Sequence, residues 1–224
     1  MKTYWWKILG ALFLIYTFTA GFLIKVPVVG NLYETIRNLY FHVPMWFAQL
    51  ILLTISAIQA IRYLSKGNLL FDIHSNAFAK TGIVFGILGL ITGAIWANFT
   101  WGEPWSNDPK QIAAAIALLI YLAYFVLRNS ITDIDKRARV SSVYNIFAYF
   151  MYIPLIMILP RLVESLHPGG QGVEGNPGLN GSDLDPRMRM VFWPAVIGWT
   201  LLGAWISSLL IRIEKLSDKN LIHA

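Results

Sequence analysis

Two of the four histidines stand where an imidazole could bind a metal or a ligand. His42 and His167 each lie at the edge of a long apolar run of the chain. An ionisable side chain close to a membrane-spanning run is a functional candidate, because charge is costly at that depth. Each histidine could instead be an interfacial residue that hydrogen-bonds nearby backbone. His74 and His223, in a polar loop and at the tail, are expected to be solvated surface residues.

An aromatic block lies between these two histidines in the sequence. Residues 96–109 read WANFTWGEPWSNDP, with Trp96, Trp101 and Trp105 at spacings of five and four. Gly102 and the two prolines predict irregular backbone, which membrane proteins tolerate at depth only where protein covers it or where it lines a cavity. The indoles could form no more than an interfacial belt, which is common for tryptophan. Their density favours a platform for a flat apolar ligand.

Asp108 closes the block and is followed by Pro109. An Asp–Pro pair is typical of a helix start, with Asp as the N-cap and Pro at the first helical position. We therefore expect Asp108 to cap the following helix, in preference to contacting a ligand directly.

Haem b suits this combination of residue types. Neutral imidazole binds iron and a planar macrocycle needs flat apolar faces beside it, so His42 and His167 are predicted to be axial ligands of haem iron. The haem propionates would need cations. The candidates on the same face are Arg37, Lys110, Arg161, Arg187 and Arg189. A zinc or copper site is a weaker prediction, because this face holds two histidines and the chain has no cysteine.

The composition indicates which elements must position these residues. Of 224 residues, 56% are hydrophobic and only 13% are charged, whereas about a quarter of a soluble domain is charged. The net charge of +6 comes from basic residues scattered between apolar runs, which argues against a nucleic-acid partner and favours a membrane orientation signal. The absence of cysteine excludes disulfides and thioether attachment of a cofactor.

Six apolar runs are long enough to cross a bilayer, for which about 20 residues are needed. The predicted spans are roughly 6–24, 43–61, 78–98, 111–127, 143–160 and 191–211. The first run could be a signal peptide, but it is longer than such apolar cores and no clear cleavage site follows it. We therefore predict an all-α integral membrane protein, with residues 1–224 forming a single polytopic domain.

Loop charges predict the orientation of the spans. With the N-terminus in the cytoplasm, the inside segments hold twelve Lys and Arg residues and the outside segments hold six, as the positive-inside rule expects. Both termini are then cytoplasmic. The loops 96–109 and 161–190 and the segment 38–44 are then periplasmic, so nearly all the unusual chemistry falls on one face. The glycine-rich part 168–185 is expected to be an irregular loop.

The pattern WGxxWxxDP at 101–109, with histidines at 42 and 167, resembles the haem-handling proteins that carry a tryptophan-rich "WWD" signature and serve cytochrome c maturation. His42-Val43-Pro44 also matches the first histidine motif of that family. The size and number of spans are most similar to the CcmC members, whereas the CcmF and CcsA types carry more helices. The resemblance covers essentially the whole chain.

The resemblance implies a haem-delivery protein of the bacterial inner membrane with its haem site facing the periplasm. It implies that His42 and His167 are the axial ligands, and that the Trp block with Gly102 and Asp108 is the platform for haem and for the haem chaperone CcmE. The expected partners are CcmE, the ABC-type transporter subunits CcmA and CcmB, and a small CcmD-like membrane protein.

Three alternatives remain open from the sequence. A b-type haem electron-transfer protein would usually hold its histidines well inside the spans. A CcsA-like haem export or cytochrome c synthase component would share the signature. A small-solute transporter should carry polar residues at mid-span, where the chain offers little beyond Thr54, Gln59, Thr92 and Asn145. No nucleophile–base pair or nucleotide-binding loop is evident, so we do not expect an enzyme.

Overall fold

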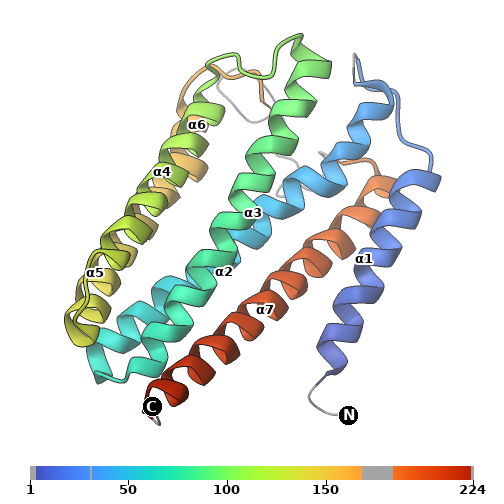
Figure 1. The fold of residues 1–224 in the computed structure, drawn as a ribbon. Coiled ribbons are helices and arrows are strands. Elements are labelled where there is room, and N and C mark those ends of the chain that lie inside the picture. The colour runs from blue at the N-terminus through green and yellow to red at the C-terminus, as the bar shows by residue number, and fades with distance from the viewer. Residues whose placement is uncertain (1–3, 31, 168–183, 223–224) are drawn as a thin grey trace.

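The computed structural model describes residues 4–30, 32–167 and 184–222, and their regular structure is entirely helical (Figure 1). The α-helices are α1 (Trp5–Leu23), α2 (Leu39–Lys66), α3 (Leu69–Trp101), α4 (Pro109–Asn129), α5 (Ile134–Ile153), α6 (Leu159–Leu162) and α7 (Pro186–Ile222). A 3-10 helix, η1 (Tyr33–Asn38), leads into α2, and a π-helical turn, η2 (Pro154–Ile158), joins α5 to α6. Six helical segments in the described residues are long and apolar enough to cross a membrane, which confirms the predicted six-span, all-α class.

The helices form a bundle with two distinct ends (Figure 1). Both chain termini lie at one end, here called the termini end. The opposite end, here called the loop end, gathers the last turns of α1 and α3 and the first turns of α2, α4 and α7 (Figure 1). His42, the Trp block and His167 therefore lie at the loop end.

Several helices extend beyond the predicted spans, and this moves two elements of the candidate site. His42, expected just before the second span, lies in the first turns of α2. Trp96 and Trp101 lie in the last turns of α3, so the irregular segment is shorter than 96–109 and begins at Gly102. Gly102 ends the helix with a φ of 88°, a left-handed conformation that glycine adopts without steric cost. Apolar runs underestimate helix length because helices continue through polar turns.

A row of glycines on α3 brings α2 unusually close. Gly82, Gly86, Gly89 and Gly93 recur at spacings of four, three and four, which places them along one face of the helix. A Cβ built on any of them would lie less than 3.0 Å from a side chain of α2, which in order are Leu53, Gln49, Trp46 and His42. Small residues commonly allow such close helix packing in membranes. This contact sets the position of His42.

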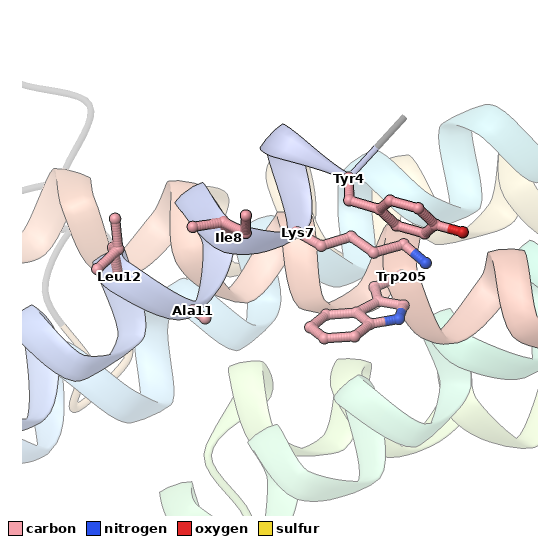
Figure 2. Close-up of a pocket in the computed structure, with 6 residues that line it drawn as sticks. All are labelled: Tyr4, Lys7, Ile8, Ala11, Leu12 and Trp205. Atoms are coloured by element: carbon pink, nitrogen blue, oxygen red, sulfur yellow. The ribbon is translucent and has the colours of Figure 1, made fainter. Parts of the chain in front are cut away.

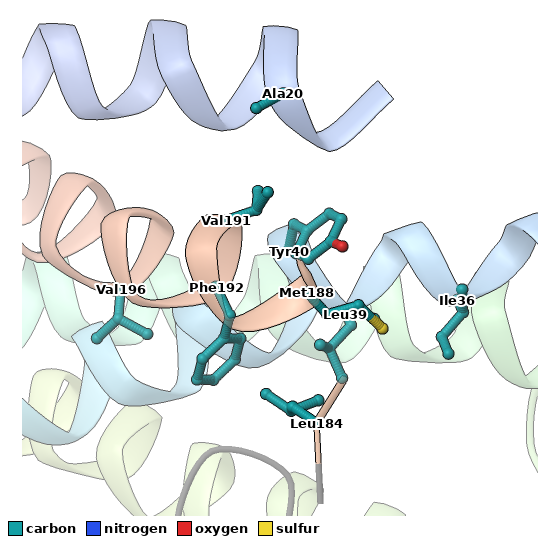
Figure 3. Packing of buried hydrophobic residues seen from close by; sticks show 9 residues of the cluster. All are labelled: Ala20, Ile36, Leu39, Tyr40, Leu184, Met188, Val191, Phe192 and Val196. Atoms are coloured by element: carbon teal, nitrogen blue, oxygen red, sulfur yellow. The ribbon is translucent and has the colours of Figure 1, made fainter. Parts of the chain in front are cut away.

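A buried apolar cluster anchors the first turns of α2 from the other side. It is built around Tyr40, which is fully buried, and around Val191 and Phe192 of α7 (Figure 3). The remaining members are Ala20, Ile36, Leu39, Leu184, Met188 and Val196 (Figure 3). Such close packing of side chains stabilises helix contacts within a bilayer, where the lipid tails are as apolar as the side chains. The loop end of α2 is thus fixed between α3, α1 and α7.

The termini end carries a buried ion pair between α3 and α4. The Arg128 guanidinium donates from both terminal nitrogens to the Asp72 carboxylate, at 2.7 and 2.6 Å. Both residues are only 4% exposed. A paired geometry of this kind is required where charge is buried.

Candidate functional site

His167 follows the fifth span and is held by a buried carboxylate. Its Nδ1 lies 2.8 Å from Oδ1 of Asp108, which precedes it by 59 residues in the sequence. Because a carboxylate only accepts hydrogen bonds, the proton must sit on Nδ1 of the neutral ring. The edge of the imidazole meets Trp101, with ring centroids 4.8 Å apart at 76°.

Asp108 organises two segments at once. Its Oδ1 accepts from the Lys110 backbone N–H at 2.9 Å, which confirms the predicted N-cap of α4. Its Oδ2 accepts from the Ser165 hydroxyl at 2.8 Å and from the Leu166 N–H at 2.7 Å. The residue is only 4% exposed. Asp108 therefore caps α4 and also fixes the segment that presents His167, a second role that the sequence did not predict.

The electrostatics of the pair favour an ionised acid beside a neutral imidazole. Burial opposes ionisation of Asp108, but the hydrogen bonds that His167, Ser165 and Leu166 donate to it outweigh this effect, so the Asp108 pKa lies well below its ordinary value. Burial lowers the pKa of His167, and the nearby Lys110 charge lowers it further, while the hydrogen bond to Asp108 opposes the shift. The His167 pKa therefore falls below 6.5, and the ring is neutral at pH 7.

His42 is held in the same way by a backbone carbonyl. Its Nδ1 lies 2.9 Å from the Gly89 carbonyl oxygen and 3.2 Å from the Thr92 hydroxyl, both on α3. The carbonyl can only accept, so Nδ1 again carries the proton. The indoles of Trp46 and Trp96 stand edge-on to the ring, with centroids at 6.2 and 6.0 Å.

The two histidines thus share one chemical state. In each, Nδ1 donates to a fixed acceptor, so Nε2 of the neutral ring keeps its lone pair. A second hydrogen bond of this kind usually orients a metal-ligating histidine. Each Nε2 could therefore donate to a metal ion such as haem iron. Within the described residues, no group of three or more His, Cys, Asp or Glu could hold a metal ion.

The predicted Trp block divides into three parts. Trp96 stands against His42, and its Nε1 donates to the Thr35 hydroxyl at 3.3 Å. Trp101 stands against His167. These two indoles are five residues apart on α3, a rise of about 7.5 Å, so one helix end contacts both histidines. Trp105 lies in the loop, is 40% exposed, and donates from Nε1 to Asn107 Oδ1 at 3.0 Å.

The candidate propionate cations are not equally available. Arg37 donates to the Gly21 and Ile24 carbonyl oxygens at the end of α1, at 2.6 and 2.8 Å, and pairs with Glu34. Arg187 forms a two-pronged pair with Asp185 at 3.0 Å. Arg161 is exposed and makes no hydrogen bond or ion pair within the described chain. The guanidinium of Arg37 thus stabilises the fold, whereas the donors of Arg161 have no partner within the described residues.

Two features of this site escaped the sequence analysis. The pairing of Asp108 with His167 joins residues 59 positions apart, and no local pattern marks it. The acceptor for His42 is the Gly89 carbonyl oxygen. The imidazole can reach it because the row of glycines lets α2 approach α3 closely. The spacing of four, three and four along α3 was the signal that could have indicated a close helix contact.

Comparison with known proteins identifies a family. The family model described as CcmC, heme exporter protein C, matches residues 1–221. Heme exporter protein C of Rhodobacter capsulatus is 28% identical over 117 residues, which are 52% of this chain and 48% of that protein. The Paracoccus denitrificans protein of the same name is 28% identical over 109 residues, 49% of this chain and 45% of its own length. The match thus spans about half the length of these two relatives.

A longer alignment is found with heme exporter protein C of Escherichia coli strain K12, at 24% identity over 183 residues, 82% of this chain and 70% of that protein. A short segment is similar to cytochrome c biogenesis protein CcsA of Prochlorococcus marinus, at 57% identity over 49 residues, 22% of this chain and 16% of that protein. Because the family match extends over nearly all 224 residues, the chain belongs to the CcmC family.

Proposed function

We propose that this protein binds haem at its loop end through His42 and His167 and delivers it for cytochrome c maturation. The observation that carries the proposal is the pair of Nδ1 hydrogen bonds, to Gly89 O and Asp108 Oδ1, which leaves both Nε2 lone pairs for iron. The names of the relatives, heme exporter protein C, point to the same cargo.

The remaining residues of the site would receive the rest of the haem. Trp96 and Trp101 border the two histidines and offer apolar surface to a macrocycle. Arg161, exposed in α6, is the propionate contact we favour. Arg37 and Arg187 would have to leave the acceptors Gly21 and Asp185 first. We propose haem b as the cargo, because the chain has no cysteine for covalent attachment.

The unequal partners of the two histidines suggest an order of release. A carboxylate polarises the Nδ1–H of His167 more strongly than a carbonyl polarises that of His42, which makes His167 the more basic ligand. His42 would therefore release iron first. Haem would remain on His167 while a partner ligand takes the vacated position.

The hand-over partner would be a haem chaperone of the CcmE kind. Trp105, Gly102 and neighbouring Glu103 are exposed in the loop between α3 and α4 and offer it a contact surface. We place this end in the periplasm and the protein in the bacterial inner membrane. CcmA, CcmB and a CcmD-like protein are the proposed complex partners.

An absorption spectrum of the purified protein tests the haem site. The protein in mild detergent should take up haem and show the bands of a six-coordinate bis-histidine complex. His42→Ala and His167→Ala should each lose that spectrum, whereas His74→Ala, in the first turns of α3 near the termini end, should keep it. Unchanged spectra in both site variants would refute the axial-ligand assignment.

A further inference from the structure

A groove at the termini end combines a buried cation with an apolar wall. It has a volume of about 310 Å³ and is lined by Tyr4, Lys7, Ile8, Ala11 and Leu12 of the α1 region and by Trp205 of α7 (Figure 2). It lies at the opposite end of the bundle from the two histidines, so the proposed haem site does not account for it.

Lys7 is the unusual member of the groove. It is only 8% exposed, and its ammonium lies 5.2 Å from the Tyr4 ring centroid and 5.1 Å from that of Trp205 (Figure 2). The Trp6 ring centroid is 5.5 Å away. Aromatic rings attract a cation through their π electrons, but they do not supply oxygen or nitrogen acceptors for the three ammonium N–H donors. The Lys7 ammonium has no hydrogen bond or salt bridge to any described residue, so its three donors are unused within the described part of the chain.

The surroundings of Lys7 also favour binding of an anion. Lys7 stands in the first turn of α1, where the helix dipole adds positive potential. None of the six lining residues carries negative charge. A negatively charged group is therefore the complementary occupant.

The position of the groove relative to the membrane indicates which kind of molecule carries that negative charge. Trp205 lies 19 residues along α7 from Pro186, a rise of about 28 Å, which is close to the roughly 30 Å of bilayer hydrocarbon. Lys7 lies in the first turn of the 19-residue span Trp5–Leu23. Both residues therefore lie at one membrane–water boundary, where phospholipid phosphates are found.

The apolar wall continues from the groove along α1. Ile8, Leu12 and Ile15 follow one face of the helix and are 61%, 57% and 61% exposed. This stripe could hold an acyl chain, while the groove holds the glycerol region and Lys7 holds the phosphate. We propose that this groove is a binding site for one anionic phospholipid, of the phosphatidylglycerol class.

Native mass spectrometry of the protein with added lipid tests the site. Phosphatidylglycerol and phosphatidylcholine with identical acyl chains are offered together. The wild type should retain one phosphatidylglycerol with at least about fivefold preference. Lys7→Met, which keeps the buried stem and removes the charge, should abolish the preference, and Lys7→Arg should retain it. Lys66→Gln, which removes an exposed cation at the same end of the bundle, is the matched control.

Two results would overturn the site. One is equal retention of the two lipids by the wild type, and the other is a preference that survives in Lys7→Met. Ala11→Phe should fill the groove and reduce phosphatidylglycerol retention with Lys7 intact. Inorganic phosphate at the lipid concentration should not displace the lipid, because it cannot use the apolar wall, and its displacement of the lipid would also contradict the proposal.

Discussion

At the scale of single residues, Asp108 both caps α4 and accepts a hydrogen bond from His167, and one substitution can separate these two roles. An Asn at this position still offers a side-chain oxygen to cap α4. Its amide can also donate to Nδ1 of His167, which moves the ring proton to Nε2 and removes the lone pair that the proposed bond to iron needs. Asp108 is therefore a positioning residue for His167, in addition to the cap that its sequence context predicts.

Asp108→Asn should weaken haem binding by about 10- to 100-fold, the usual effect of losing the partner of a metal-ligating histidine. The measurement is a haem titration followed by absorption. Asp133→Asn is the matched control, because Asp133 caps α5 in the same manner and is exposed at the other end of the bundle. Equal losses in the two variants would reduce Asp108 to a cap.

The protonation of His167 gives a pH dependence at the same scale. Its pKa lies below 6.5, so the neutral ring with Nδ1–H is the state at pH 7. Since the folded pKa is lower than the unfolded one, the stability from burying the neutral ring is complete above pH 6.5 and is lost as the pH falls. Haem binding should follow the same direction, because a proton competes with iron for Nε2.

Nitrogen NMR of histidine-labelled protein measures this directly. At pH 7 the His167 signals should be those of the Nδ1-protonated tautomer, with His167→Gln used for assignment. Haem affinity should be level from pH 8 to about 6.5 and decline below. An imidazolium signal at pH 7 would contradict the assigned state.

At the scale of helices, the contact between α2 and α3 determines where His42 stands. A Cβ on Gly93 would lie 2.6 Å from His42 Cε1, so the ring would have to move away from its acceptor Gly89 O. Gly82 is equally tight, with a Cβ position 2.8 Å from Leu53 Cδ2, but it lies three turns further from the loop end.

Gly93→Ala should therefore lose the bis-histidine haem spectrum, whereas Gly82→Ala should retain it. Both variants overpack the same helix pair and should lose about 1–3 kcal/mol of stability, seen as a lower midpoint of thermal unfolding in detergent. A normal haem spectrum in Gly93→Ala would show that the glycine row does not position His42.

This helix pair also shows what the sequence could and could not predict. The six spans follow from apolar runs, because the bilayer demands about 20 such residues whatever the tertiary structure. The extension of α2 back to Leu39 and of α3 to Trp101 depends on contacts with other helices, so hydropathy missed it. The cap at Asp108 is a local pattern and was predicted correctly. Its bond to His167 and the bonds of Arg37 to α1 join distant segments, which no spacing along the chain encodes.

At the scale of the whole molecule, the bundle has two distinct ends, so its orientation in the membrane can be tested. The Lys and Arg residues are divided twelve to six between the alternate loops, and the loops with the larger number meet at the termini end. The positive-inside rule then predicts a cytoplasmic termini end and a periplasmic loop end. That orientation would place His42, His167 and the exposed Trp105 on the side where cytochrome c maturation would need haem.

The absence of cysteine makes the test clean, because a single introduced thiol is the only one in the chain. Glu103→Cys lies in the exposed loop after α3, and Ser130→Cys lies in the exposed turn after α4. A membrane-impermeant maleimide added to intact spheroplasts should label Glu103→Cys at once and Ser130→Cys only after lysis. The reverse pattern would place the haem site in the cytoplasm, and the protein would then have to accept haem at that face instead of presenting it outside.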